Sequence, residues 1–126
     1  MAGHPDAAAL VAAVRDFLGG LKLDGRDAFH AKVAGNVLAI VERELVARPD
    51  AAAAAALAPI VPDDGKEEED VPSLRTQICT ALRDGSLGHA TPGLLDALVA
   101  ANLAALAVDN PRYSTFLRRA AAAPQR

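Results

Sequence analysis

The stretch "TPGLLDALVAANLAALAVDNPRY", residues 91–113, decides the fold, because it carries the clearest helix pattern in the chain. Thr91 is a residue type that caps helix N-termini, and Pro92 suits the first helical position. Large apolar residues then recur at helical spacing: Leu95, Leu98, Val99, Leu103 and Leu106. Asn110 tolerates the geometry of a helix end, and Pro111 cannot continue the hydrogen-bond ladder. The stretch therefore predicts a helix that starts at Pro92, stops before Pro111 and turns its large apolar residues inward.

Three further segments show the same spacing, and each predicts an amphipathic helix with a buried stripe. They cover residues 5–18 (Leu10, Val14, Phe17 and Leu18), residues 26–47 (Phe29, Val33, Val37, Ile40, Val41 and Leu45) and residues 73–84 (Leu74, Ile78 and Leu82). The run "DAAAAAALAPIVP", residues 50–62, predicts a short helix capped by Asp50 and ended by Pro59. Alanine has little area to bury, so we expect this helix to dock weakly.

Composition points to the same class of fold. Thirty of the 126 residues are alanine and aromatic residues make up 3%, so summed propensity favours helix over strand. We predict an all-α, single-domain bundle over residues 1–126, with four main helices and the short alanine-rich helix. The acidic segment 62–70 is expected to be a flexible loop, and residues 117–126 a basic tail with a frayed helical end.

The net charge and the single cysteine indicate which partners and which cellular compartment to expect. The net charge is −3, and the segment 62–70 alone holds six acidic residues and one lysine, so no basic nucleic-acid surface is expected. Cys79 has no second cysteine to pair with, which favours a reducing compartment. The start of the chain lacks the pattern of a signal peptide. The apolar run 92–108 is shorter than the about 20 residues that cross a bilayer, so we expect a soluble cytoplasmic protein without a membrane partner.

The sequence carries no recognisable catalytic or metal-binding motif. The three histidines, His4, His30 and His89, show no metal-ligand spacing, and glycine-rich phosphate loops are absent. Four aromatic residues offer little surface for a stacked cofactor, so no cofactor and no metal are expected. Cys79 is interpreted as a small packing residue rather than a nucleophile. The acidic segment is interpreted as solvated, the alternative being loose binding of divalent ions.

Two asparagines fall on or beside predicted apolar stripes. Asn36 lies between Val33 and Ile40, and Asn102 lies between Val99 and Leu106. A buried amide needs hydrogen-bond partners, so the two side chains are candidates for buried bonds to each other or to a backbone carbonyl that fix helix register. The alternative is that they face a groove for a ligand or a partner chain. Gly35, next to Asn36, predicts a close approach by another helix or a partner.

The end of the deciding stretch, "DNPRY" (109–113), includes the only tyrosine in the chain. Asn110 and Pro111 are sufficient to end the helix. Ending the helix does not require an arginine and a tyrosine at positions 112 and 113. Arginine and tyrosine are enriched at protein–protein interfaces and among their energetic hot spots. Arg112 and Tyr113, together with Arg43 and Glu44, are therefore the candidate partner-binding residues.

Three segments together, "HPDAAALVAAVRDFL" (4–18), "AFHAKVAGNVLAIVEREL" (28–45) and "LAVDNPRY" (106–113), resemble a small all-helical bacterial family of unknown function. Its members are similar to the accessory protein of the hydroxyacyl-CoA kinase in levulinate and 4-hydroxy-acid catabolism. Family genes typically lie beside an aminoglycoside-phosphotransferase-like kinase and an acyl-CoA dehydrogenase-like protein. The resemblance implies a non-catalytic subunit that binds the kinase, and it assigns no catalytic residue.

The leading hypothesis from the sequence is thus an accessory subunit rather than an enzyme. Its expected partner is the phosphotransferase-like kinase, with the acyl-CoA dehydrogenase-like protein as a further candidate. The alternative hypothesis is a stand-alone helical bundle that binds a small acyl ligand in its core. An enzyme built from scattered residues such as His30, Asn36 and Asn102 is the least favoured of the three.

Overall fold

A computed structural model of the chain describes residues 3–61 and 70–122, and in these residues it has six α-helices and no strand. The helices are α1 (Ala7–Gly20), α2 (Gly25–Ala47), α3 (Pro49–Leu57), α4 (Val71–Asp84), α5 (Leu94–Asp109) and α6 (Ser114–Ala122). The predicted all-α class is confirmed. The helices group into two compact units, Met1–Arg48 and Pro49–Arg126. The predicted detail of four main helices is not confirmed, because the described residues form six helices.

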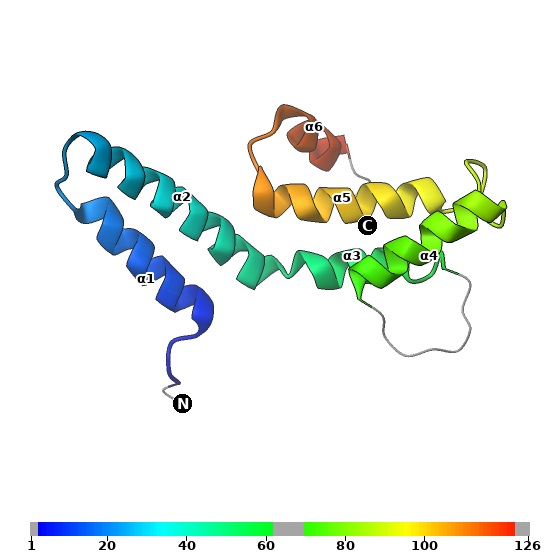
Figure 1. Ribbon diagram of the computed structural model, residues 1–126, viewed down its shortest axis with the longest axis horizontal. Coiled ribbons are helices and arrows are strands. Elements are labelled where there is room, and N and C mark those ends of the chain that lie inside the picture. The colour runs from blue at the N-terminus through cyan, green and yellow to red at the C-terminus, as the bar shows by residue number, and fades with distance from the viewer. Residues whose placement is uncertain (1–2, 62–69, 123–126) are drawn as a thin grey trace. The chain divides into compact units, whose positions relative to one another are not determined.

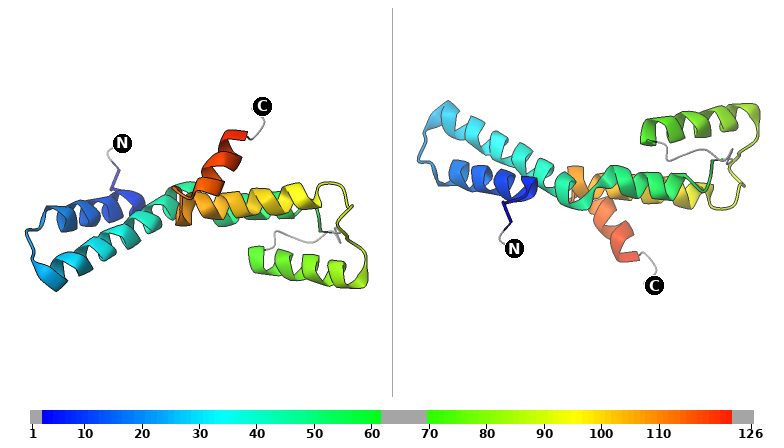
Figure 2. Two further views of the ribbon diagram at one scale, coloured as in Figure 1. Left: turned by 90° about the horizontal axis from the view of Figure 1, so that it is seen from above. Right: turned by 90° about the horizontal axis from the view of Figure 1, so that it is seen from below.

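Unit 1, residues 1–48, is a helical hairpin in which α1 and α2 run antiparallel and side by side (Figures 1 and 2). Asp6 caps α1, because its Oδ1 accepts a hydrogen bond from the Ala9 N–H at 2.8 Å. Residues 21–24 connect the helices, and α2 ends at Arg48 in the left-handed conformation with φ 47°. The predicted bounds of both helices are confirmed to within two residues.

The predicted buried stripes of unit 1 are wrong. No residue of α1 or α2 is buried, and Leu10, Val14, Phe17, Phe29, Val33, Val37 and Leu45 are exposed. Only Leu18, Ile40 and Val41 of the predicted stripes are half-buried. Each helix of a hairpin has one neighbour, so it covers one side of its partner and leaves the other sides open. The side that is covered is rich in small residues, among them Ala31, Ala34 and Gly35.

Unit 2, residues 49–126, contains the hydrophobic core. Helix α3 packs against α5 and, less extensively, against α4. The core has contributions from all three helices and from the segments that follow α3 and α4: Ala53, Leu57, Val61, Val71, Leu74, Ile78, Ala81, Leu87, Leu94, Ala97 and Ala101. The expectation that the alanine-rich helix docks weakly is therefore wrong. Small side chains on α3 and α5 let the two helices approach closely, so alanine here contributes to packing rather than opposing it.

Helix α5 buries a different stripe from the predicted one. Its buried residues are Leu94, Ala97, Ala101 and Val108, whereas Leu95 is exposed and Leu98, Val99, Leu103 and Leu106 are half-buried. The helix is apolar or alanine on nearly every side, so periodicity alone does not select the face that α3 covers. On α4, Leu74 and Ile78 are buried as predicted, but Ala81 takes the place expected for Leu82.

Caps differ from the prediction at two helices. Gly93, with φ 83°, is the N-cap of α5, and Thr91 lies in the preceding turn, where its Oγ1 accepts a hydrogen bond from the Gly88 N–H at 2.8 Å. The Pro92–Gly93 pair extends the turn, because glycine reaches positive φ without strain. Helix α3 begins at Pro49, so Asp50 lies in its first turn and is not its cap.

Two predicted flexible segments fall partly outside the described residues. The acidic loop 62–70 is described only at Asp70, which caps α4 by accepting a hydrogen bond from the Ser73 N–H at 2.9 Å. Of the tail 117–126, residues 117–122 belong to α6, and the last four residues lie outside the described part. No helix among the described residues combines the length and hydropathy that a membrane span requires.

Candidate functional site

The backbone around residues 109–113 forms a defined corner between α5 and α6 (Figure 1). The Asn110 N–H donates to the Leu106 carbonyl at 2.9 Å, which closes α5. The Tyr113 N–H then donates to the Asn110 carbonyl at 3.1 Å, and the Leu117 N–H donates to the Tyr113 carbonyl at 3.0 Å, which opens α6. The predicted helix stop is confirmed. Consecutive hydrogen bonds hold the corner, so the side chains that it carries project from a fixed backbone.

Those side chains are exposed and of the types that form interface hot spots. Arg112 is exposed, and Tyr113 keeps 45% of its surface accessible. Leu117, in the first turns of α6, is 52% exposed, and its backbone N–H donates to the Tyr113 carbonyl. Arg112, Tyr113 and Leu117 form what we call the α5–α6 corner patch.

The other two predicted partner-binding residues belong to unit 1. Arg43 is half-buried and Glu44 is exposed, both near the end of α2. The Glu44 carbonyl accepts the hydrogen bond from the Arg48 N–H at 2.9 Å that ends the helix. Arg43 and Glu44 thus lie in a different unit from Arg112 and Tyr113, and the four residues do not form a patch within either unit.

Asn36 and Asn102 are both exposed, and they too belong to different units. The structure therefore does not contain the predicted buried amide pair. The reason is that α2 and α5 each turn alanines, rather than their polar positions, toward the neighbouring helix. Asn36 is among the residues that line a groove in unit 1.

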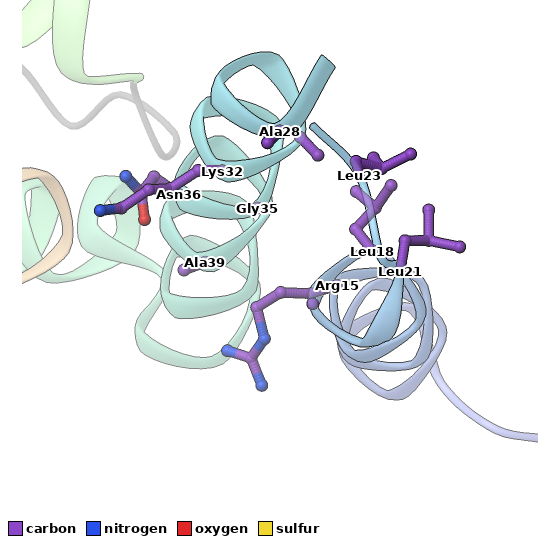
Figure 3. Close-up of a pocket in the computed structure, with 11 residues that line it drawn as sticks. Arg15, Leu18, Leu21, Leu23, Ala28, Lys32, Gly35, Asn36 and Ala39 are labelled. Carbon is purple, nitrogen blue, oxygen red and sulfur yellow. The ribbon is translucent and has the colours of Figure 1, made fainter. Parts of the chain in front are cut away.

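That groove lies between α1 and α2 and has a volume of about 400 Å³. Its lining is mainly apolar or small, with two cations and one amide: Leu18, Gly19, Leu21, Leu23, Ala28, Ala31, Gly35, Ala39, Arg15, Lys32 and Asn36. In Figure 3 the three leucines lie on the α1 side, whereas Lys32 and Asn36 extend from the far side of α2. A hydrocarbon chain is the ligand chemistry that suits such a lining.

Two interactions and one glycine define how the groove is built. Arg15 Nη1 lies 2.6 Å from Glu42 Oε2, an ion pair that joins α1 to α2. Arg15 also approaches Asp16 Oδ1 at 3.7 Å. Apart from Gly35, its chain neighbours and the adjacent backbone of α2, no heavy atom lies within 4 Å of the position that a Cβ would occupy at Gly35, so the predicted close approach by another helix is absent. Gly35 instead leaves the wall of the groove open.

In the described part of the chain, the other residues with reactive or metal-binding side chains do not form a cluster. Cys79 is exposed on α4, so its interpretation as a packing residue is wrong. Within residues 3–61 and 70–122, no group of three or more histidine, cysteine, aspartate or glutamate side chains has the geometry of a metal site. In the part of the chain that the structure describes, hydrogen bonds from the Ser86 hydroxyl and backbone N–H lower the pKa of the Asp84 carboxyl below its ordinary value.

Residues 21–113, about three quarters of the chain, match a family described as a domain of unknown function, DUF6285. The chain belongs to the DUF6285 family. The DUF6285 match covers α2 to α5 and ends at Tyr113, so α1 and α6 lie outside it. Of the three segments behind the resemblance, 28–45 and 106–113 fall within the DUF6285 match and 4–18 does not. No curated protein and no solved structure matches the chain.

Sequence reasoning found two of the three corner residues and missed Leu117. Residues 117–126 are predicted as a basic tail because all of their charged residues are arginines. The spacing of Tyr113, Phe116 and Leu117 is the signal that predicts an amphipathic turn there. In the structure Phe116 is half-buried and Leu117 is exposed.

Proposed function

We propose that this chain is a non-catalytic accessory subunit of an aminoglycoside-phosphotransferase-like kinase that acts on a hydroxyacyl-CoA. The observation that carries the proposal is the α5–α6 corner patch, an exposed tyrosine, arginine and leucine on a hydrogen-bonded backbone. A rigid aromatic anchor loses little conformational entropy on binding, which is why such residues dominate interface energetics. The resemblance of the family segments supplies the class of partner. An acyl-CoA dehydrogenase-like protein is a second candidate partner.

The proposal is tested by co-expressing the chain with the neighbouring kinase and measuring the complex by gel filtration and kinase activity. We expect co-elution and an increase in phosphorylation of the hydroxyacyl-CoA when the subunit is added. Independent elution together with unchanged kinase activity would overturn the proposal.

The docking surface is tested by replacing Arg112 and Tyr113 with alanine. Both side chains are exposed, so the fold should persist, and binding to the kinase should weaken at least about tenfold because hot-spot truncations cost more than 1.4 kcal/mol. Arg83→Ala removes an exposed arginine from α4 and is the matched control. Equal loss of binding in the control and the test variant would contradict the assignment of the corner patch.

A second candidate function, binding of a small acyl ligand, is favoured by the groove between α1 and α2. Its volume of about 400 Å³ lies within the range of about 300 to 1,000 Å³ typical of ligand pockets. Acyl-CoAs and free acids are screened by thermal shift, since a ligand at about 100 times its Kd adds about 2.7 kcal/mol of stability. Gly35→Leu fills open space in the groove and should abolish the shift, whereas Gly35→Ala should retain most of it. An equal shift in all three proteins would place the ligand elsewhere.

A further inference from the structure

Residues 110–122, which include the corner and helix α6, carry positive charge without any compensating acid. They contain Arg112, Arg118 and Arg119 and no acidic residue, whereas the chain as a whole carries −3. All three arginines are exposed. In the part of the chain that the structure describes, none of them forms an ion pair, and Asp109, the acidic residue that precedes the segment, forms none either. The three guanidinium groups are therefore open to a partner.

We propose that these three arginines steer the partner of the α5–α6 corner patch, and that the surface of the partner that meets the patch is acidic. This inference rests on the proposed function, because it assigns a surface charge to the same kinase at the same site. It also adds Arg118 and Arg119, which lie beyond the DUF6285 match, to the docking surface.

Helix α6 carries its two arginines on different sides. Phe116 is half-buried, and α6 packs against α5 and projects from its end (Figure 2). With 3.6 residues per turn, Arg118 lies about 200° around the helix from Phe116, and Arg119 lies about 60° from it. Arg118 Nη2 donates a hydrogen bond to Thr115 Oγ1 at 3.2 Å, which holds this guanidinium against the helix. The two charges thus surround α6 and do not share one contact face.

Charges that share no face still act together over a distance. Helix α6 rises about 1.5 Å per residue, so both of its arginines lie within about 8 Å, along the axis, of the first residue of the helix. The Debye length is about 8 Å at physiological ionic strength, so the fields of the three arginines overlap at the corner patch. Such a field raises the rate of encounter with a surface of opposite charge. We therefore assign the arginines to steering, and Tyr113 and Leu117 to anchoring.

An acidic protein surface suits this segment better than an anionic membrane. An interfacial helix binds lipid through a large apolar face combined with cations. Within residues 110–122, Phe116 is half-buried, and Tyr113 and Leu117 are the large apolar side chains that are exposed. Arginine and tyrosine are both enriched at protein–protein interfaces. A membrane is therefore the alternative that the experiment separates.

Association kinetics of the full-length chain with the neighbouring kinase, measured by surface plasmon resonance, test the proposal. The association rate constant should fall at least about tenfold from low to high salt, because salt screens the steering field. Arg118→Glu combined with Arg119→Glu should lower this constant at least about tenfold at low salt, and should change the dissociation rate constant less than about threefold. Tyr113→Ala should show the opposite pattern, with faster dissociation.

The matched control places the same charge change elsewhere in unit 2. Arg75→Glu combined with Arg83→Glu replaces two exposed arginines of α4, and should lower the association rate constant less than about threefold. If the α6 glutamate pair loses helical circular dichroism, Arg118→Gln with Arg119→Gln replaces it, because glutamine favours helix and removes only the charge. Unchanged association in this milder variant counts against the proposal.

Three outcomes would overturn the inference: association that salt leaves unchanged, equal effects of the α4 and α6 pairs, or a substitution pair in α6 that abolishes binding to vesicles and leaves kinase association unchanged. The vesicles are phosphatidylcholine with about a quarter phosphatidylserine. The kinase complex also separates this inference from the proposed function. A complex that forms with unchanged rates in the α6 pair overturns the steering role alone, whereas the absence of any complex overturns both.

Discussion

Individual polar residues in unit 2 hold the ends of its helices, and Asp70 is the clearest case. Its carboxylate accepts the Ser73 N–H at 2.9 Å and satisfies one of the unpaired donors at the start of α4. Asp70→Ala should lower the free energy of unfolding by about 1 kcal/mol, as measured by urea titration. Asp70→Asn preserves the acceptor and should stay close to wild type. A loss of the same size in both variants would assign the effect to charge instead of the hydrogen bond.

At the other end of α4, the Ser86 hydroxyl and backbone N–H both donate to the Asp84 carboxylate and lower its pKa. A lowered folded-state pKa stabilises the protein at pH values above the ordinary carboxyl range, and the contribution is lost as pH falls through the folded pKa. Ser86→Ala removes the hydroxyl donor, so we expect the pKa of Asp84 to rise toward its ordinary value. Carboxyl chemical shifts followed by NMR over an acid titration measure it. An unchanged Asp84 midpoint would show that the backbone donor suffices.

At the scale of helices, the contact between α3 and α5 depends on small side chains. Ala101 is 2% exposed in the core, whereas its neighbour Ala100 faces solvent on the same helix. Ala101→Leu should destabilise the protein by about 1 to 3 kcal/mol, because the added atoms force the two helices apart. Ala100→Leu should change stability by less than about 0.5 kcal/mol. Chemical denaturation of both variants checks the pair, and equal stability would contradict the close packing assigned to Ala101.

The ends of several helices are determined by residue types within one turn of the end, so they can be predicted from the sequence. Asp6, Gly85 and the Asn110–Pro111 pair mark ends that act over one turn, so these boundaries are predictable. Which side of α5 is buried is not predictable in the same way, since alanines and leucines surround that helix and only the approach of α3 selects a face. Close packing between alanines leaves no periodic signal of large residues, which explains why Leu95 was expected inside.

The same distinction between local residue properties and contacts between helices applies to the candidate site. Arg112 and Tyr113 stand out from the sequence because residue type and an adjacent helix stop are both local properties. The groove between α1 and α2 is lined by residues of both helices, and the Arg15–Glu42 ion pair joins positions 27 residues apart, so neither has a sequence signature. The predicted buried pair of Asn36 and Asn102 is absent because both side chains are exposed, which the apolar residues around them in the sequence do not reveal.

At the scale of the whole molecule, the two units differ in how they achieve stability. Unit 2 encloses a core. In unit 1, by contrast, neither α1 nor α2 has a buried residue, although their large apolar residues recur at the spacing of a buried stripe. Isolated helices gain most of their stability from packing an amphipathic face, so a hairpin with uncovered stripes is expected to open more readily than unit 2.

Amide hydrogen exchange measures this difference directly in the full-length chain. Within unit 1 each helix packs against one partner helix only, so amide protons of α1 and α2 should exchange at least about tenfold faster than those of the core segments of α3, α4 and α5, a difference worth about 1.4 kcal/mol. Equal exchange rates in the hairpin and in these core segments would contradict the difference in stability between the two units.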